Sequence, residues 1–374
     1  MLQKLKLKTI YLFLFLFGST IYSQTYPLSP ASKVSILTCG SGEQLHSIFG
    51  HTAIRIQEPQ RHIDVVYNFG MFDFSTPNFY LKFVKGDMQY FVANNTFEEF
   101  IYGYRMENRS VFEQELDLST EQKQHLFDEL NKILFSDERF YTYKFIDKNC
   151  TTMVLDKVNE ELGKPLIQKV GNREESYRDV LNPYLTNLFY EKLGINIIFG
   201  CRTDEKATQL FLPVELMNSL EKLQFNQKPI VSKTVTLFEQ DRSLLSSSWW
   251  NTIYTFLFIL LVIALSHHTK IYLSFLVVLS LLGIFLSLVG FYSLHREVLL
   301  NYNVLLFNPL LLGIVYFYLQ KNKIWFTRLL YFVLINFGLY LLFIFNKAHF
   351  IQMLPMALTT SYILFRLNKN IQKG

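Results

Sequence analysis

The chain has 374 residues, of which half are hydrophobic and 16% aromatic, and it carries a formal net charge of +5. This small charge, with no basic stripe, no glycine-rich phosphate loop and no internal repeat, excludes a nucleic-acid-binding, a P-loop and a repeat protein. The hydrophobic residues are unevenly spread, since residues 251–366 are mostly Leu, Ile, Phe, Tyr and Val. Residues 25–250 have the mixed composition of a soluble domain, so we expect a soluble region followed by a membrane region.

Residues 1–23 have the layout of a signal peptide. Three lysines lie among the first eight residues, the apolar run IYLFLFLFG follows, and STIYS ends the stretch. A signal cleaved after Ser23 and a retained first transmembrane helix both fit this layout, and no cysteine follows directly to indicate a lipoprotein signal. With either, residues 25–250 are predicted to lie outside the cytoplasmic membrane.

Three short apolar or alternating segments are predicted as strands. They are residues 33–38 (KVSILT), 51–56 (HTAIRI) and 63–70 (IDVVYNFG). Alternation in the second segment puts His51 and Thr52 on opposite faces. If the last two strands form a hairpin centred between the P and Q of the turn-like EPQRH, His51 lies opposite Asn68.

Capping signals and helical periodicity predict three helices away from these strands. They run from Ser119 to about Phe135, over residues 177–193, and from Pro213 to about Leu223. The first two follow a capping box, in which Ser is followed three residues later by Gln or Asp. Residues 226–250 have no clear pattern, and we interpret them as a linker that ends in the aromatic pair Trp249-Trp250, which is typical of a membrane interface.

A further helix is predicted to begin with a cysteine. Asn149 suits the N-cap position, a helical pattern follows Cys150, and Gly163 fits a C-terminal stop. A helix N-terminus stabilises a thiolate, because its unpaired amides and its dipole favour an anion. Cys150 is therefore a candidate nucleophile, and a buried structural cysteine is the alternative interpretation.

A thiolate nucleophile needs a base, and the base needs a group that fixes its tautomer. The candidates are His51 as the base and Asn68 as the third residue. Asp64 and Asp73 are the alternatives for the third role. His51 alone also fits a hydrogen-bonded structural residue on a strand.

Other polar residues are weaker candidates. Arg105, Asn108 and Arg109 cluster in YRMENRS and, with His295 in SLHRE, are candidate ligands for a lipid phosphate or headgroup; a structural turn and an interfacial anchor are the alternatives. The other two cysteines, Cys39 and Cys201, form a disulfide in one interpretation and are free thiols in the other. No metal-ligand spacing is present, and the chemistry requires no cofactor.

Five apolar runs after residue 251 are predicted as transmembrane helices. They lie at about 252–265, 271–290, 303–319, 325–345 and 350–365. With residues 25–250 outside, the predicted inner segments hold seven cations, namely Lys270, Lys321, Lys323, Arg328, Arg366, Lys369 and Lys373. The outer loops hold two, Arg296 and Lys347, so the positive-inside rule supports this orientation and the count of five.

A histidine on a strand followed by Asn-Cys at a helix start resembles the circularly permuted papain-like fold of the lecithin:retinol acyltransferase type and of NlpC-type relatives. More closely, four segments resemble the periplasmic domain of the Bacteroidota lipoprotein N-acyltransferase family, Lnb. They are LTCGSGEQLHSIFGHTAIRI, DVVYNFGMFDFSTPNFYLKFVKG, YRMENRSVFEQELDLSTEQ and FIDKNCTTMVLD. The segment SLHREVLLNYNVLLFNPLLL resembles the membrane domain of that family.

The resemblance implies an α+β fold: a permuted papain-like domain over residues 24–225, then the linker 226–250 and a five-helix membrane domain over 251–374. It implies an enzyme of the inner membrane, with its catalytic domain in the periplasm. The implied reaction moves a fatty acyl chain from a phospholipid to the free α-amino group of the diacylglyceryl-cysteine of a lipoprotein. On the family pattern His51 and Cys150 are base and nucleophile, whereas Asn68 rests on the hairpin alone.

Two other functions also fit the residues. The first is a membrane-anchored cysteine peptidase or amidase that acts on peptidoglycan, with the apolar helices as a plain anchor. The second is a membrane assembly or sensor protein that uses the papain-like domain as a non-enzymatic binding module. The reactivity of Cys150 and the product formed from phospholipid distinguish these three functions.

Overall fold

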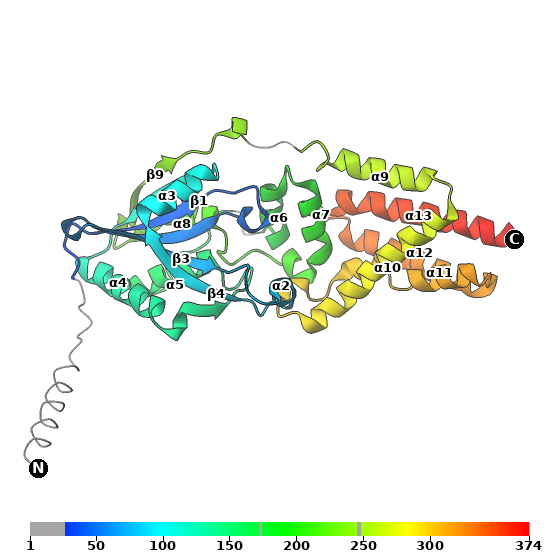
Figure 1. The fold of residues 1–374 in the computed structure, drawn as a ribbon, viewed down its shortest axis with the longest axis horizontal. Coiled ribbons are helices and arrows are strands. Elements are labelled where there is room, and N and C mark those ends of the chain that lie inside the picture. Colours follow the sequence, from blue (N-terminus) through cyan, green and yellow to red (C-terminus); the bar gives the residue numbers. More distant parts are fainter. Residues whose placement is uncertain (1–26, 172–173, 245–247, 374) are drawn as a thin grey trace, which may run out of the picture.

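The computed structural model describes residues 27–171, 174–244 and 248–373. An α+β region comes first and a helical region follows, and the two lie end to end (Figure 1). The chain's C-terminus lies at the end of the helical region farthest from the sheet. The predicted signal segment, residues 1–23, lies outside the described residues.

The α+β region is built on a seven-stranded antiparallel sheet in the order β6-β4-β3-β2-β1-β5-β9. The strands are β1 (Lys33–Cys39), β2 (His51–Glu58), β3 (Ile63–Met71), β4 (Gln89–Thr96), β5 (Val111–Leu116), β6 (Phe140–Thr142) and β9 (Val231–Phe238). A separate pair, β7 (Gln224–Phe225) and β8 (Lys228–Pro229), precedes the last strand. The three strands predicted from the sequence are confirmed, whereas β9 falls inside the stretch interpreted as a linker.

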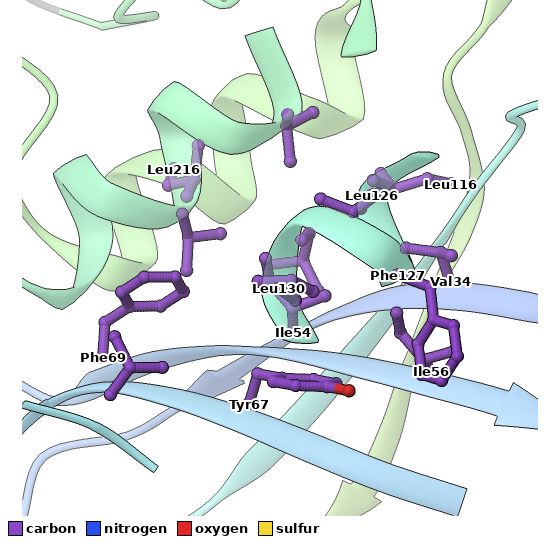
Figure 2. Packing of buried hydrophobic residues seen from close by; sticks show 14 of the residues in the cluster. Val34, Ile54, Ile56, Tyr67, Phe69, Leu116, Leu126, Phe127, Leu130 and Leu216 are labelled. Atoms are coloured by element: carbon purple, nitrogen blue, oxygen red, sulfur yellow. The ribbon is translucent and has the colours of Figure 1, made fainter. Parts of the chain in front are cut away.

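Helices cover both faces of the sheet. They are α2 (Phe79–Lys85), α3 (Phe97–Met106), α4 (Thr120–Leu134), α5 (Cys150–Glu161) and α8 (Pro213–Lys222). Figure 2 shows the larger core, where Leu130 of α4 and Leu216 of α8 face Ile54 and Tyr67 of the sheet. Each fully buried side chain of this kind contributes roughly 1.5–3 kcal/mol.

The predicted alternation of the His51 strand is confirmed. Ile54 and Ile56 belong to the larger core, while Ala53 belongs to a smaller core on the opposite face with Phe100 of α3. Ser119 caps α4 through the predicted capping box with Gln122. Local patterns were therefore sufficient to place these two elements.

The predicted hairpin register was wrong by two residues. Asn68 pairs with Ala53, where we expected His51. The connection contains a 3₁₀ turn over Pro59–Arg61 and then His62 at φ 55°, which moves the centre of the hairpin along the chain. Because side chains alternate with a period of two, a shift of two keeps His51 and Asn68 on the same face.

The single helix predicted over residues 177–193 was also wrong. The structure has α6 (Tyr177–Leu181), a 3₁₀ turn over Asn182–Leu185, and then α7 (Phe189–Ile198). Pro183 explains the break, because proline donates no backbone hydrogen bond and disfavours a helical residue before it. The predicted cap of Ser176 by Asp179 is confirmed.

The helical region contains α9 (Ile253–Leu265), α10 (Thr269–Tyr292), α11 (Leu311–Leu319), α12 (Lys323–Ile344) and α13 (Phe350–Lys373). Within the described residues, α10, α12 and α13 are long and apolar enough to cross a membrane. With 13 and nine residues, α9 and α11 fall short of the roughly 30 Å hydrocarbon core at about 1.5 Å per residue. The number of spans predicted, five, stays a prediction.

The third apolar run, predicted over 303–319, is not one helix. A 3₁₀ turn over Tyr302–Leu305 precedes Pro309, and α11 begins only at Leu311. The helix α10 supports this interruption, because Ser280 Oγ donates to Pro309 O over 2.7 Å. Gly283 permits the close approach, since a Cβ there would lie 1.4 Å from Phe307 O.

The two outer-loop cations contact the α+β region. Arg296 lies 3.7 Å from Asp147, and Lys347 lies 3.2 Å from Asp204. At the other end of the bundle, Arg366 lies 3.2 Å from His267. The loops predicted to be outside therefore lie on the same side as residues 27–244, as the orientation requires.

A buried arginine joins the two regions. Arg178 of α6 is 2% exposed and forms an ion pair of 2.8 Å with Asp204. Its other hydrogen-bond partners are Asn196, Phe199, Gly200, Thr203 and Tyr302. Tyr302 comes from the turn before α11 and also donates to Asp204 over 2.6 Å, so this network fixes α6 to the helical region.

Candidate active site

Cys150 and His51 each begin an element, and the two elements pack together. Asn149 caps α5 by accepting from the Thr152 backbone over 3.0 Å, as the sequence predicted. The hydroxyls of Thr52 and Thr151 lie 3.0 Å apart in the buried contact between β2 and α5. The residues that follow His51 and Cys150 therefore fix the two elements against each other and bring the candidate base to the thiol.

The Asn68 amide fixes the tautomer of His51. His51 Nε2 lies 3.2 Å from Asn68 Oδ1, while Asn68 Nδ2 donates to Val66 O over 3.3 Å. The amide oxygen therefore faces the imidazole and accepts, so Nε2 carries the hydrogen and Nδ1 of the neutral ring is left as an acceptor. Asn68 is the residue proposed from the hairpin, and the structure brings it to His51 despite the shifted register.

The electrostatic surroundings favour a thiolate at Cys150. Burial opposes ionisation, but the charge of His51 and its hydrogen bond to the sulfur outweigh burial, so the pKa of Cys150 is lowered. Hydrogen bonds from the Thr52 backbone and the Thr151 hydroxyl act in the same direction. The His51 imidazole, which Asn68 orients, is thus also the main factor that lowers the pKa of Cys150.

The other two cysteines are not activated. All three cysteines are free, so Cys39 and Cys201 form no disulfide. Burial raises the pKa of Cys39 to about 12. Burial and the nearby Asp204 raise the pKa of Cys201. Cys150 is therefore the thiol that can serve as a nucleophile near neutral pH.

Alkylation should distinguish these thiols. The lowered pKa of Cys150 means that its thiolate persists below the pH at which a free cysteine, with a pKa of about 8.5, is protonated. We expect the midpoint of its reaction with iodoacetamide, followed by peptide mass spectrometry, to lie below that value. Cys39 should stay unlabelled in the folded protein. A Cys150 midpoint at or above the free value would contradict the assignment.

Two residues that we did not predict complete the surroundings of Cys150. Gly70 has a φ of 83°, which favours glycine, and a Cβ there would lie 3.6 Å from Cys150 Cβ and 3.7 Å from the Tyr141 hydroxyl. That hydroxyl is buried and donates to no acceptor among the described residues, while the backbone N–H of Gly70 faces its oxygen. Phe140 is exposed and Tyr141 is buried, as in a strand with one covered face. This pattern does not reveal that the Tyr141 ring points toward Cys150.

The alternatives for the third role lie elsewhere. Asp64 forms an ion pair of 2.7 Å with Arg55. Asp73 accepts from the backbone and the hydroxyl of Ser75 on an exposed loop. Neither carboxylate contacts His51, so Asn68 is the residue among the three candidates that can orient it.

The candidates in YRMENRS hold a loop together. Arg109 is buried, donates to Gly40 O over 3.1 Å and lies over the Tyr104 ring. Asn108, at φ 49°, exchanges two hydrogen bonds of 2.8 Å with the backbone of Asp241. Arg105 is exposed at the end of α3. The structural interpretation accounts for the contacts of Asn108 and Arg109, and a role in phosphate binding stays a prediction.

His295 lies at the contact between the two regions. Its Nε2 donates to Phe83 O of α2 over 2.9 Å, and its backbone N–H donates to Ser293 Oγ over 3.2 Å. The loop after α10 is thereby attached to the α+β region near the candidate site. A direct contact of His295 with substrate stays a prediction.

Residues 20–182 match the family model of the Lnb N-terminal periplasmic domain. This region belongs to the Lnb family. The match contains β1 to β6, the N-terminus of α5 and the three residues Cys150, His51 and Asn68. It implies an acyltransferase and suggests N-acylation of lipoproteins. No curated protein and no solved structure matches the chain.

Proposed function

We propose that the protein transfers a fatty acyl chain from a phospholipid to the free α-amino group of the diacylglyceryl-cysteine of lipoproteins. The observation that carries the proposal is Cys150, a thiol of lowered pKa at a helix N-terminus, hydrogen-bonded to a histidine that Asn68 orients. It lies in an Lnb domain attached to helices that can cross a membrane. An enzyme whose two substrates are lipid-anchored needs its reactive group held at the bilayer surface.

In the first half-reaction the Cys150 thiolate attacks the carbonyl carbon of a phospholipid ester. The bond between that carbon and the ester oxygen breaks. The proton on His51 passes to the leaving oxygen and gives a lysophospholipid, while the acyl chain remains on Sγ as a thioester. The imidazole is then neutral, with Nδ1 as acceptor because Asn68 Oδ1 holds the hydrogen on Nε2.

In the second half-reaction the free α-amine of the lipoprotein attacks the thioester carbonyl. Its proton passes to His51, the carbon–sulfur bond breaks, and an amide forms. The thiolate of Cys150 and the protonated His51 are restored as a pair. Amines attack thioesters readily, and the apolar surroundings of the site disfavour hydrolysis.

Two donors can stabilise the oxyanion that forms in each step. The N–H groups of the first helical turn have no intrahelical acceptor, which makes the Cys150 amide one of the donors we propose. The buried Tyr141 hydroxyl near Gly70 is the second, since it donates to no acceptor among the described residues. Both lie beside the sulfur that carries the acyl group.

Replacing Tyr141 by phenylalanine tests the second donor. Loss of one oxyanion donor typically costs about 10²–10³ in kcat, and we expect at least tenfold slower acylation of Cys150 because a backbone donor remains. The measurement is the rate of acyl-adduct formation by intact-protein mass spectrometry, with Tyr67→Phe as the control, because the buried Tyr67 hydroxyl is bonded to Asn131. A rate unchanged in Tyr141→Phe would remove this residue from the mechanism.

We further propose a permuted papain-like arrangement and five spans of the inner membrane, with the Lnb domain in the periplasm. A strand histidine beside a cysteine in the first turn of a helix supports the first, as do the antiparallel strands around them. The outer-loop contacts of Arg296 and Lys347 with the α+β region support the orientation. The short helices α9 and α11 would then cross where the bilayer is locally thinned.

The decisive experiment is intact-protein mass spectrometry after incubation with phospholipid. We expect an acyl adduct on Cys150 that hydroxylamine removes, and its transfer to a synthetic diacyl lipopeptide added afterwards. Cleavage of muropeptides without any acyl adduct would instead support a peptidoglycan amidase. Neither adduct nor cleavage, with a Cys150 no more reactive than free cysteine, would support a binding module.

A further inference from the structure

The short helix α2 has an apolar face with no cover among the described residues. Tyr80 is 77% exposed and Leu81 64% exposed, and Phe83 and Val84 are exposed beside them. The exposed Phe74 precedes the helix and continues the same patch. A contiguous apolar surface of this kind marks an interaction site on a protein that is otherwise soluble in this region.

The position of α2 is fixed against the end of a candidate membrane span. Ser293 Oγ donates to Val84 O over 2.7 Å, and Leu294 N donates to Lys85 O over 2.6 Å. With the His295 bond to Phe83 O, these contacts take up the last carbonyl groups of α2. Figure 1 shows α2 at the junction between the sheet region and α10.

A glycine makes this junction tight. Gly86 ends α2 at φ 75°, and a Cβ there would lie 2.9 Å from His295 Cδ2. The helix therefore cannot move away from the end of α10 without losing three hydrogen bonds. These contacts fix the position of α2 relative to the end of α10.

The apolar face of α2 is continuous with the exposed end of α10. Phe291 is 91% exposed, and Tyr292 and Leu294 are more than half exposed. These residues stand where α10 leaves the hydrocarbon core, the level at which aromatic side chains gather. The outward side chains of α2 lie at the same level. Lys82 in its last turn can bind lipid phosphates, whereas Lys85 forms an ion pair with Asp87.

The inner side of α2 leads to the thiol. Phe79 packs on Phe72 at 5.9 Å between ring centroids, and Phe72 packs on Tyr90 at 5.3 Å. Tyr90 stacks on Tyr143 at 4.4 Å. Phe72, Phe79, Tyr143 and Cys150 all pack against the same core, so a row of aromatic rings leads from α2 to the core that Cys150 also contacts.

We propose that α2 is an interfacial helix that docks on the phospholipid bilayer, with the side chains of Tyr80, Leu81 and Val84 among the acyl chains of the outer leaflet. The docking itself does not depend on the reaction. The second part of the proposal rests on the proposed function: the row of aromatic rings from α2 brings the ester of a docked phospholipid to Cys150. A second copy of the chain or another protein on this face would be a different occupant, and the test separates them.

The test uses tryptophan fluorescence in lipid bilayers. Trp249, Trp250 and Trp325 are replaced by phenylalanine, and Leu81→Trp is introduced into the full chain in nanodiscs. We expect blue-shifted emission that phospholipids brominated on the acyl chain quench by about half or more. Phe135→Trp is the matched control, because Phe135 is 83% exposed at the end of α4 and should be neither shifted nor quenched. Tyr80→Trp replaces Leu81→Trp if that variant does not fold.

A second arm connects docking to the reaction. Leu81→Asp is expected to slow acylation of Cys150 by bilayer phospholipid about tenfold, whereas Phe135→Asp should not change it. Quenching without acylation in any variant keeps the docking and rejects the proposed function. Acylation without quenching keeps the proposed function and rejects the docking. Emission that is blue-shifted but not quenched means that protein covers α2, and this result overturns the proposal.

Discussion

Replacing Cys150 by alanine is expected to abolish both the acyl adduct and N-acylation of a diacyl lipopeptide, a loss of about 10³-fold or more. The physical reason is that no other thiol can replace it. Burial raises the pKa of Cys39 to about 12, and burial also raises the pKa of Cys201. The measurement is mass spectrometry of the lipopeptide after incubation with phospholipid and the purified variant.

The matched control is Cys201→Ser, which removes a free thiol from the same region. Its transfer rate should stay within a factor of two of the wild type.

His51→Ala is informative in a different way, because the thiol remains but the cause of its lowered pKa is removed. The alkylation midpoint of Cys150 should then rise while transfer falls. Transfer that survives in Cys150→Ala would reject the thioester mechanism.

Replacing Arg178 by methionine is expected to give the largest loss of stability. The guanidinium is buried, and without it the Asp204 carboxylate keeps Lys347 and the Tyr302 hydroxyl as its partners among the described residues. Breaking a buried ion pair by removing one partner costs about 3–5 kcal/mol, which corresponds to a fall in Tm of roughly 4–6 °C for a chain of this size.

Thermal unfolding in detergent micelles, followed by circular dichroism, measures this effect. Arg242→Met is the control, because Arg242 is exposed near the end of the α+β region. The double change Arg178→Met with Asp204→Asn should lose less than the single change, since it leaves no buried carboxylate without its guanidinium partner. A Tm within 2 °C of the wild type for Arg178→Met would show that the network does not hold the two regions together.

Signals that lie within one turn or one strand were sufficient to predict the candidate site. Asn149 as cap, Cys150 as first helical residue and the alternation around His51 each depend on neighbours in sequence, and each is present in the structure. The pairing of His51 with Asn68 survived a register error because the error was an even number of residues. An error of one residue would have placed Asn68 on the opposite face.

The rest depends on contacts between residues far apart in the chain. The strand β6 positions Tyr141, but only its packing beside Gly70 brings the hydroxyl to the thiol. Arg178 looks like a surface residue of an amphipathic helix until its partners from α7 and the turn before α11 surround it. β9 was missed because an edge strand has exposed polar residues on one side and so lacks a clear alternation.

The place of β9 in the chain has a consequence for how the molecule is made. β9 pairs with β5 although more than a hundred residues separate them, so the edge of β5 stays open until Phe238 has been synthesised. Residues 239–252 then separate the completed sheet from α9. The ribosome therefore delivers the strand that closes the soluble region almost together with the first apolar helix. A fragment intended for expression without the membrane helices should extend through Phe238, since one that stops at residue 225 leaves an unpaired strand edge open to aggregation.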